Sequence, residues 1–181
     1  MTKLTLGEQE YLGAVRTKVR KVAELLKPEI NHALDDSRAW YSYLTAIKFA
    51  FGNLDNDISF VGVLMAKEYL LRTLEVEPLD VSTKPQGAPG LDIDGRTVSG
   101  ERIVGELKTT FPYGALGLGA KQKSSFRKDF VKLQKAKAVH KYFFVTERKT
   151  FEIAIAKYRR EIPGVKVVLL PDGPEEEIPN D

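Results

Sequence analysis

Two short segments, LDIDG at residues 91–95 and RIVGELKT at residues 102–109, carry the pattern that decides the fold. Apolar and polar residues alternate in both, which is typical of strands, because successive side chains of a strand point to opposite faces. Residues 97–100 (TVSG) favour a short turn between them. We therefore predict a two-strand meander with one face directed toward a hydrophobic core.

Charged residues gather on the other face of this predicted meander. Residues two apart in a strand share a face, so Glu106 and Lys108 point the same way. Asp92 and Asp94 likewise share a face of the preceding strand. If the two strands pair, three carboxylates and one ammonium meet on one patch of sheet. The opposite, core-facing side is expected to carry Ile103, Gly105 and Leu107.

The sequence before the meander predicts three helices. Apolar residues at three- and four-residue steps indicate a first helix that Pro28 ends. A second helix is expected over residues 37–52, with Ser37 as its cap. Its inward-facing residues are predicted to be Trp40, Tyr43, Leu44, Ile47 and Phe51. A third helix is expected to be capped by Asp57 or Ser59 and to end near residue 74, before a proline-rich loop over residues 76–90 with at most one short strand.

The sequence after the meander alternates between helices and strands. The glycine-rich segment 111–120 is expected to be mobile. A basic amphipathic helix is predicted over residues 121–138, and its buried residues are Phe126, Phe130 and Leu133. A strand at 141–146, a helix at 150–162 and a strand at 165–170 follow.

This order of elements predicts the fold class and the domain organisation. A helix, strands and then alternating helices and strands indicate an α/β fold with a mixed central sheet flanked by helices. We expect residues 1–55 to form an N-terminal helical region for recognition or dimerisation. Residues 56–172 are expected to form the core domain, and residues 173–181 a disordered acidic tail.

The composition excludes several classes of chemistry. The chain has 181 residues, no cysteine and two histidines that lie far apart, which excludes disulfides, thiol nucleophiles and cysteine-based metal sites. No apolar stretch approaches the roughly 18 residues that a membrane span needs, so no membrane partner is expected. The charged N-terminus does not resemble a signal peptide, and we expect a cytoplasmic protein.

Basic residues are concentrated between residues 121 and 141, although the net charge is only +3. Asp129 is the one acidic residue in that segment. An excess of one sign on a helix favours a polyanionic partner such as the DNA backbone over a merely solvated face. The candidate DNA-binding residues are Lys121, Gln122, Lys123, Arg127, Lys128, Lys132 and Lys135.

The clustered carboxylates of the meander need a cation to offset their repulsion. Oxygen ligands without histidine or cysteine select a hard ion, so we expect Mg²⁺, for which Mn²⁺ can substitute. Such an ion stabilises charge on a phosphate and lowers the pKa of a bound water. A lysine beside it can orient or deprotonate that water. These residue types together predict phosphodiester hydrolysis.

The string Gly90-Leu91-Asp92-Ile93-Asp94, followed by Gly105-Glu106-Leu107-Lys108, resembles the motif of the PD-(D/E)xK nuclease superfamily, which includes type II restriction endonucleases. The core order of that family, helix, three-strand meander, helix and strand, is similar to the order predicted here from residue 58 to residue 146. The resemblance implies that Asp92 and Glu106 bind the metal and that Lys108 is the catalytic lysine. Leucine rather than proline precedes Asp92, so Asp94 remains an alternative to Asp92.

The resemblance also implies a further metal ligand on the first core helix, for which Glu68 is the candidate. Glu68 is spaced from Val61, Leu64 and Leu71 so that it falls on the apolar stripe of that helix or at its edge. A carboxylate on an apolar stripe is costly unless it is paired or binds a metal. The sequence does not distinguish whether Glu68 lies on the apolar stripe or at its edge.

Several functions remain compatible with these residues. A compact chain without motor motifs favours a type II restriction enzyme, acting as a homodimer on double-stranded DNA without a nucleotide cofactor. A junction-resolving or repair nuclease of the same fold is the nearest alternative. The segment LDIDGRT also resembles the haloacid dehalogenase superfamily, which implies a phosphatase with Asp92 as nucleophile and Asp94 as general acid. A catalytically inactive DNA-binding protein is the remaining alternative.

Overall fold

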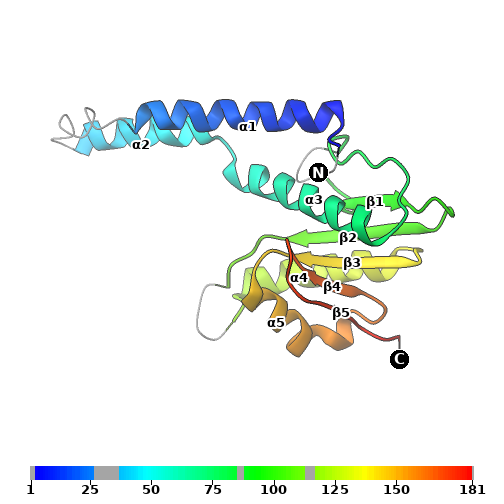
Figure 1. The fold of residues 1–181 in the computed structure, drawn as a ribbon. Helices are drawn as coiled ribbons and strands as arrows, with labels where there is room; N and C mark the ends of the chain where they lie inside the picture. Colours follow the sequence, from blue (N-terminus) through cyan, green and yellow to red (C-terminus); the bar gives the residue numbers. More distant parts are fainter. Residues whose placement is uncertain (1–2, 27–36, 85–87, 113–116, 181) are drawn as a thin grey trace. The chain divides into compact units, whose positions relative to one another are not determined.

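The computed structural model of the chain describes residues 3–26, 37–84, 88–112 and 117–180 (Figure 1). These residues belong to two compact units, Lys3–Asp57 and Ile58–Asp181. Within the described ranges, no helix is both long enough and apolar enough to cross a lipid bilayer.

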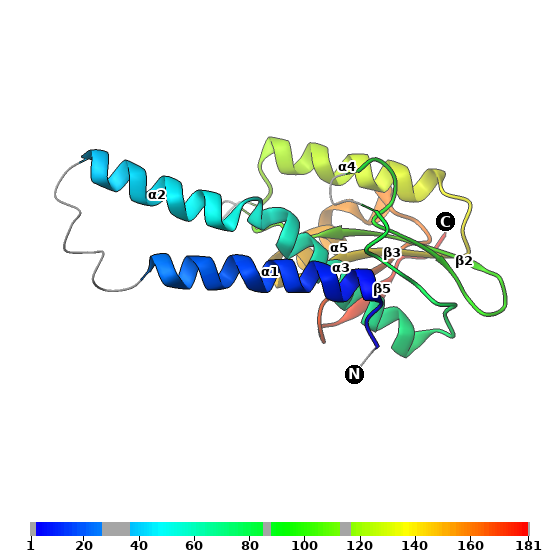
Figure 2. The same ribbon diagram turned by 90° about the horizontal axis from the view of Figure 1, so that it is seen from above.

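Two helices of the first unit, α1 (Leu6–Leu25) and α2 (Ser37–Phe51), lie side by side (Figure 2). A capping box starts α1: the Thr5 hydroxyl accepts a hydrogen bond from the Glu8 backbone N–H, and the Glu8 carboxylate accepts one from the Thr5 N–H. The Lys18 ammonium lies 2.8 Å from Asp57 Oδ2 and joins α1 to the first turn of α3 (Leu54–Thr73). The two helices predicted before residue 53 are therefore present.

The prediction that α2 directs its aromatic stripe inward is wrong for Trp40 and Leu44, whereas Tyr43, Ile47 and Phe51 are half-buried. None of the described residues of α2 is buried, and Trp40 and Leu44 are 47% and 55% exposed. The physical reason is that a two-helix hairpin offers α2 one neighbouring helix, which covers only part of its circumference.

The helix α3 begins earlier than predicted. The cap is Asn53, whose side-chain oxygen accepts a hydrogen bond from the Asn56 N–H at 3.3 Å, rather than Asp57 or Ser59. Residues 76–84 contain one isolated bridge, in which Val76 pairs with Thr97.

A five-stranded sheet with the order β1-β2-β3-β4-β5 forms the second unit together with its helices. The strands are β1 (Ile93–Arg96), β2 (Arg102–Lys108), β3 (His140–Val145), β4 (Lys166–Leu169) and β5 (Glu175–Glu177). β1 pairs antiparallel with β2, β2 to β4 are parallel to one another, and β5 is antiparallel to β4. The predicted α/β class with a mixed sheet flanked by helices is confirmed.

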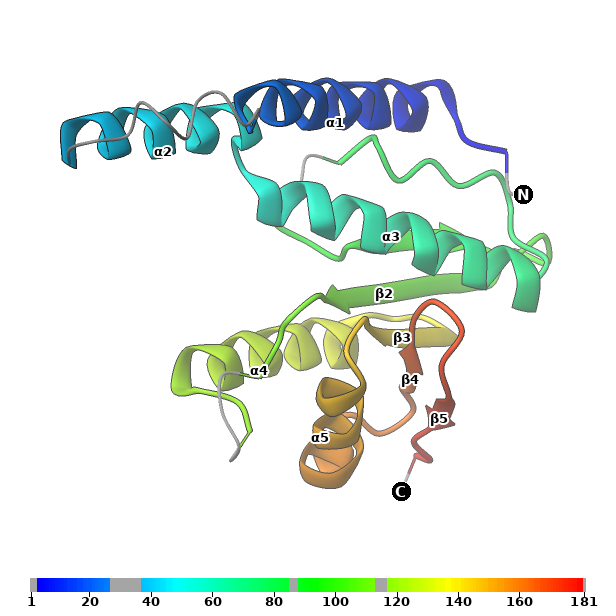
Figure 3. The ribbon, with the colours of Figure 1, turned by 60° about the vertical axis from the view of Figure 1, so that its left-hand side comes forward.

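Helices cover both faces of this sheet, with α3 on one face and α4 (Ala120–Lys135) and α5 (Arg148–Tyr158) on the other (Figure 3). On the α3 side, Tyr69 makes edge-on ring contacts with Tyr142 and Phe144. On the α4 side, the rings of Phe126 and Phe130 lie 5.4 and 5.0 Å from that of Phe143. The buried side predicted for the basic helix is therefore confirmed.

The expectation that one face of β2 alone is directed toward a core is wrong. Val104 is fully buried in the cluster beneath α4 and α5, and Leu107 is buried against α3, where a Cβ at Gly62 would lie 2.6 Å from Leu107 Cδ2. Parallel strands covered by helices on both faces bury both sets of side chains. Glu106, which shares the face of Val104, therefore lies on a buried surface.

The acidic tail is not disordered, contrary to our prediction. It forms β5, and Ile178 beyond it is only 2% exposed. Two of the three glutamates of β5 have basic partners: Lys166 Nζ lies 3.3 Å from Glu175, and Arg159 lies 2.7 Å from Glu176. The segment predicted to be mobile includes residues 113–116, which lie outside the described residues.

Replacing Phe143 by Ala should remove the ring on which Phe126 and Phe130 pack. We expect a loss of about 3–5 kcal/mol in the free energy of unfolding, measured by urea denaturation. Phe111→Ala is the matched control, because the Phe111 side chain is 67% exposed. An equal loss in the two variants would contradict the assignment of Phe143 to the core.

Candidate active site

The strand β2 places Glu106 and Lys108 on the face that α4 covers. Glu106 is 1% exposed, and its Cα lies opposite Phe143 in the neighbouring strand β3. Lys108 is the last residue of the strand, and its side chain is 17% exposed. Glu106 therefore lies within the main core, and Lys108 lies at its edge.

Asp92 lies immediately before β1 and is held beside Glu106 by the backbone. Its Oδ2 accepts a hydrogen bond from the Leu107 N–H at 2.9 Å. Asp94 is directed elsewhere, because its two carboxylate oxygens accept hydrogen bonds from the exposed Arg102 guanidinium at 2.9 and 2.6 Å. The expected meeting of Asp94 with Glu106 is therefore wrong, and Asp92 is the aspartate that the structure brings to Glu106.

The helix α4 contributes a third carboxylate and a second ammonium. Asp129 is buried beneath α4, and its Oδ2 lies 2.5 Å from Lys108 Nζ. Lys132 Nζ lies 2.9 Å from Glu106 Oε1 and 3.3 Å from Asp129 Oδ1. The Lys108 ammonium also donates a hydrogen bond to the Ser125 hydroxyl at 3.0 Å. Asp129 and Ser125 were not among the site residues predicted from the sequence.

A positional signal would have revealed Asp129. It stands three residues after Phe126 and four before Leu133, so it falls on the apolar stripe of the helix. The charge pattern of the segment, in which Asp129 is the one acid among basic residues, does not by itself indicate this place on the apolar stripe. A buried acid needs a partner, and the lysine at the end of β2 provides it.

The electrostatics of the cluster favour an additional positive charge. Burial and the neighbouring carboxylates of Asp92 and Asp129 raise the pKa of Glu106 to about 8, although Lys132 acts in the opposite direction. Desolvation lowers the pKa of Lys132, but its hydrogen bond to Glu106 and the two nearby carboxylates outweigh this and raise the pKa. Lys132 therefore stays charged, yet its charge does not fully compensate Glu106.

The donors present fit a hard cation rather than a soft one. Asp92, Glu106 and Asp129 supply only carboxylate oxygens, and burial, followed by the charges of Asp92 and Asp129, raises the pKa of Glu106. Among the described residues, however, no group of three acidic or histidine side chains forms a ready-made metal cage. Mg²⁺ retains several waters and is commonly held by one or two carboxylates, so Asp92 and Glu106 suffice as ligands.

Glu68 lies apart from this cluster. It is exposed on α3, which favours the edge of the apolar stripe over its centre. In the described part of the chain, no hydrogen bond or ion pair links Glu68 to Asp92 or Glu106.

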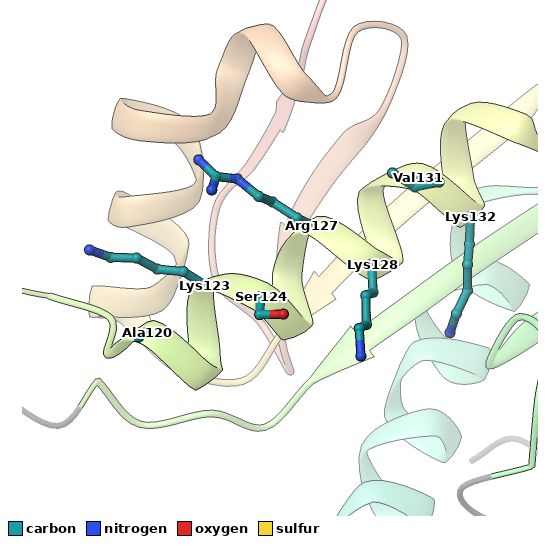
Figure 4. Close-up of a pocket in the computed structure, with 7 residues that line it drawn as sticks. All are labelled: Ala120, Lys123, Ser124, Arg127, Lys128, Val131 and Lys132. Carbon is teal, nitrogen blue, oxygen red and sulfur yellow. The ribbon is translucent and has the colours of Figure 1, made fainter.

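The outer side of α4 bears an open groove with a volume of about 770 Å³ (Figure 4). Its lining residues are Ala120, Lys123, Ser124, Arg127, Lys128, Val131 and Lys132. Arg127 is paired with Glu161 of the turn after α5 at 3.3 Å. Lys121 and Lys135 are exposed on the same helix, whereas Gln122 binds the backbone of Gly119 and Phe111 and so closes the start of α4.

Comparison with known protein families, with curated proteins and with solved structures finds no match to this chain.

The raised pKa of Glu106 predicts how stability depends on pH in the presence of EDTA. Between the ordinary value of 4.5 and about 8, the folded chain keeps a proton that the unfolded chain has lost. Stability is therefore highest below pH 4.5. It falls as the pH rises from there to about 8, by up to about 1.4 kcal/mol per pH unit, and the fall ends above the pKa of the folded state. Glu106→Gln should remove this fall, as measured by thermal unfolding from pH 5 to pH 9.

Glu152→Gln on the exposed side of α5 is the control for this measurement. Its pH profile should follow that of the wild type. If the Glu106→Gln profile follows it as well, Glu106 does not carry the raised pKa.

Proposed function

We propose that this protein is a Mg²⁺-dependent nuclease that hydrolyses phosphodiester bonds in DNA. The observation that carries the proposal is the buried Glu106 beside Asp92, with Lys108 two residues further along the same strand face. A buried carboxylate with a raised pKa, next to other acids and paired with a lysine that also lines a basic groove, is typical of a functional site. The resemblance to the PD-(D/E)xK motif points to the same three residues.

Each residue of the cluster has a role in this proposal. Asp92 and Glu106 would hold the ion, which when bound supplies charge stabilisation at the phosphate and an activated water. Lys108 donates hydrogen bonds that orient the attacking water against the phosphate. Asp129 and Ser125 hold the Lys108 ammonium in position at 2.5 and 3.0 Å. The exposed lysines of α4 hold the DNA backbone next to it.

A type II restriction enzyme remains our preferred biological role, with a junction-resolving or repair nuclease as the alternative. The described residues contain one such cluster, so cutting both strands of a duplex would require two copies related by symmetry. The homodimer and the double-stranded DNA partner are parts of the proposal.

One observation favours a second candidate, an inactive DNA-binding protein. Lys132 and Lys108 already neutralise Glu106 and Asp129, so the cluster also has the form of two structural ion pairs. The phosphatase alternative gains no such support, because Asp94 is bound to Arg102 instead of sharing a space with Asp92.

The direct test is cleavage of supercoiled plasmid by the purified protein with Mg²⁺ or with EDTA. We expect Mg²⁺-dependent cleavage, with discrete fragments for a site-specific enzyme and a smear for a non-specific one. Lys108→Ala should reduce the rate by about 10²–10⁴-fold, because it removes the group that orients the water. Lys157→Ala, at an exposed position of α5, is the control and should cleave normally. Cleavage that persists in Lys108→Ala would reject this site.

The groove on α4 predicts the salt dependence of DNA binding. Replacing Lys123 and Lys128 together by Ala should weaken binding and lower the slope of log K against log salt by about 0.9 for each phosphate that the variant leaves unneutralised. Both side chains line the groove, and the structure records no ion pair for them within the described residues. Titration of labelled duplex in EDTA at several salt concentrations measures the slope, with Lys157→Ala again as control. An unchanged slope would indicate that DNA binds to a face other than α4.

A further inference from the structure

The Lys132 ammonium occupies a position with cation-like surroundings. It lies 2.9 Å from Glu106 Oε1, 3.3 Å from Asp129 Oδ1 and 3.1 Å from the Gly90 carbonyl oxygen. Gly90 adopts a φ of 107°, which favours glycine, and its carbonyl is directed toward the lysine. Three oxygens from three separate elements thus converge on one positive group.

The same oxygens are the ones that a hard ion would use. Glu106 is the most deeply buried carboxylate of the cluster, and Lys132 is its one hydrogen-bonding side chain among the described residues. Two cations close to one carboxylate oxygen repel each other, and the repulsion is strong in a medium of low dielectric constant. An ion bound to Glu106 Oε1 and the Lys132 ammonium therefore compete for the same position.

The Lys132 side chain can move from Glu106 into the groove of α4. Its side chain is 40% exposed, and it belongs to the lining of the groove that also contains Lys128 one turn earlier on α4. The two side chains extend from the same side of the helix (Figure 4). A rotation of the long, flexible side chain moves its charge from the buried carboxylate to the groove, where phosphates are proposed to bind.

We infer that Lys132 is a resident counter-ion that holds the cation position of Glu106 in the ion-free protein, and that a divalent ion displaces it into the groove of α4. This inference rests on the proposed function, since it concerns the same site. The inference also couples ion binding at Glu106 to the charge of the groove, because the groove gains one positive charge only when the ion is bound. Lys132 is thus a positioning residue for both the ion and the DNA backbone.

The test is amine acetylation of the full chain, with the rate at each lysine followed by peptide mass spectrometry, with and without Mn²⁺. Binding of Mn²⁺ is measured on the same sample by electron paramagnetic resonance of the free ion. We expect Mn²⁺ to raise the acetylation rate of Lys132 several-fold and to leave that of Lys128 unchanged. Lys128 is an internal control because it lies on the same helix, and within the described part of the chain it makes no ion pair to the buried cluster.

Two other outcomes are distinguishable. If Mn²⁺ binds and the rate at Lys132 does not change, displacement is rejected while the proposed metal site stands. If Mn²⁺ does not bind, the proposed metal-dependent function fails and this inference fails with it. Glu106→Gln gives a second reading at pH 9, where the wild-type carboxylate is ionised, because it removes the charge that holds Lys132. Its acetylation rate should then be high without Mn²⁺, and a rate as low as in the wild type would overturn the inference.

Discussion

The ion pair between Glu106 and Lys132 is the interaction on which the rest of the candidate site depends. A carboxylate in the middle of a sheet that helices cover on both faces is costly without a partner, and the partner must come from the helix above it. This requirement fixes how α4 lies over β2. The α4 residues Ser125, Asp129 and Lys132 stand three or four positions apart, so they share one side of the helix and meet the two charged residues of the strand. The rings of Phe126, Phe130 and Phe143 hold the helix in that position.

The two ammonium groups of the cluster do not fully compensate the charge of its three carboxylates. The pKa of Glu106 stands at about 8 against an ordinary 4.5, because burial and, after it, the carboxylates of Asp92 and Asp129 oppose its ionised form. Three carboxylates and two ammonium groups leave one net negative charge when all are ionised. A purely structural ion-pair network gains nothing from such an excess. A site that is to receive a divalent ion does, because the ion relieves the repulsion as it binds.

The sequence predicted the elements of the core well because each depends on local periodicity. The alternation in residues 102–109 and the three- and four-residue spacing around Phe126 and Phe130 are properties of one strand and one helix. What the sequence could not provide depends on contacts between distant segments. The acidic tail became β5 through pairing with β4 and through Arg159 and Lys166, which its own composition does not reveal. The choice between Asp92 and Asp94 depended on Arg102, a residue that sequence analysis had not considered as their partner.

The position of Lys132 between a buried carboxylate and an exposed groove has a thermodynamic consequence for the proposed function. If a divalent ion makes Lys132 available to a phosphate, then a phosphate that captures Lys132 must favour the ion by the same factor, because coupling between two binding sites is reciprocal. One turn of helix, about 5.4 Å of rise, separates Lys132 from Lys128 in the groove, so a single polyanion backbone can reach both. Ion and DNA would then bind cooperatively without any movement of the main chain. The ion-free protein would keep its buried carboxylate neutralised until both are present.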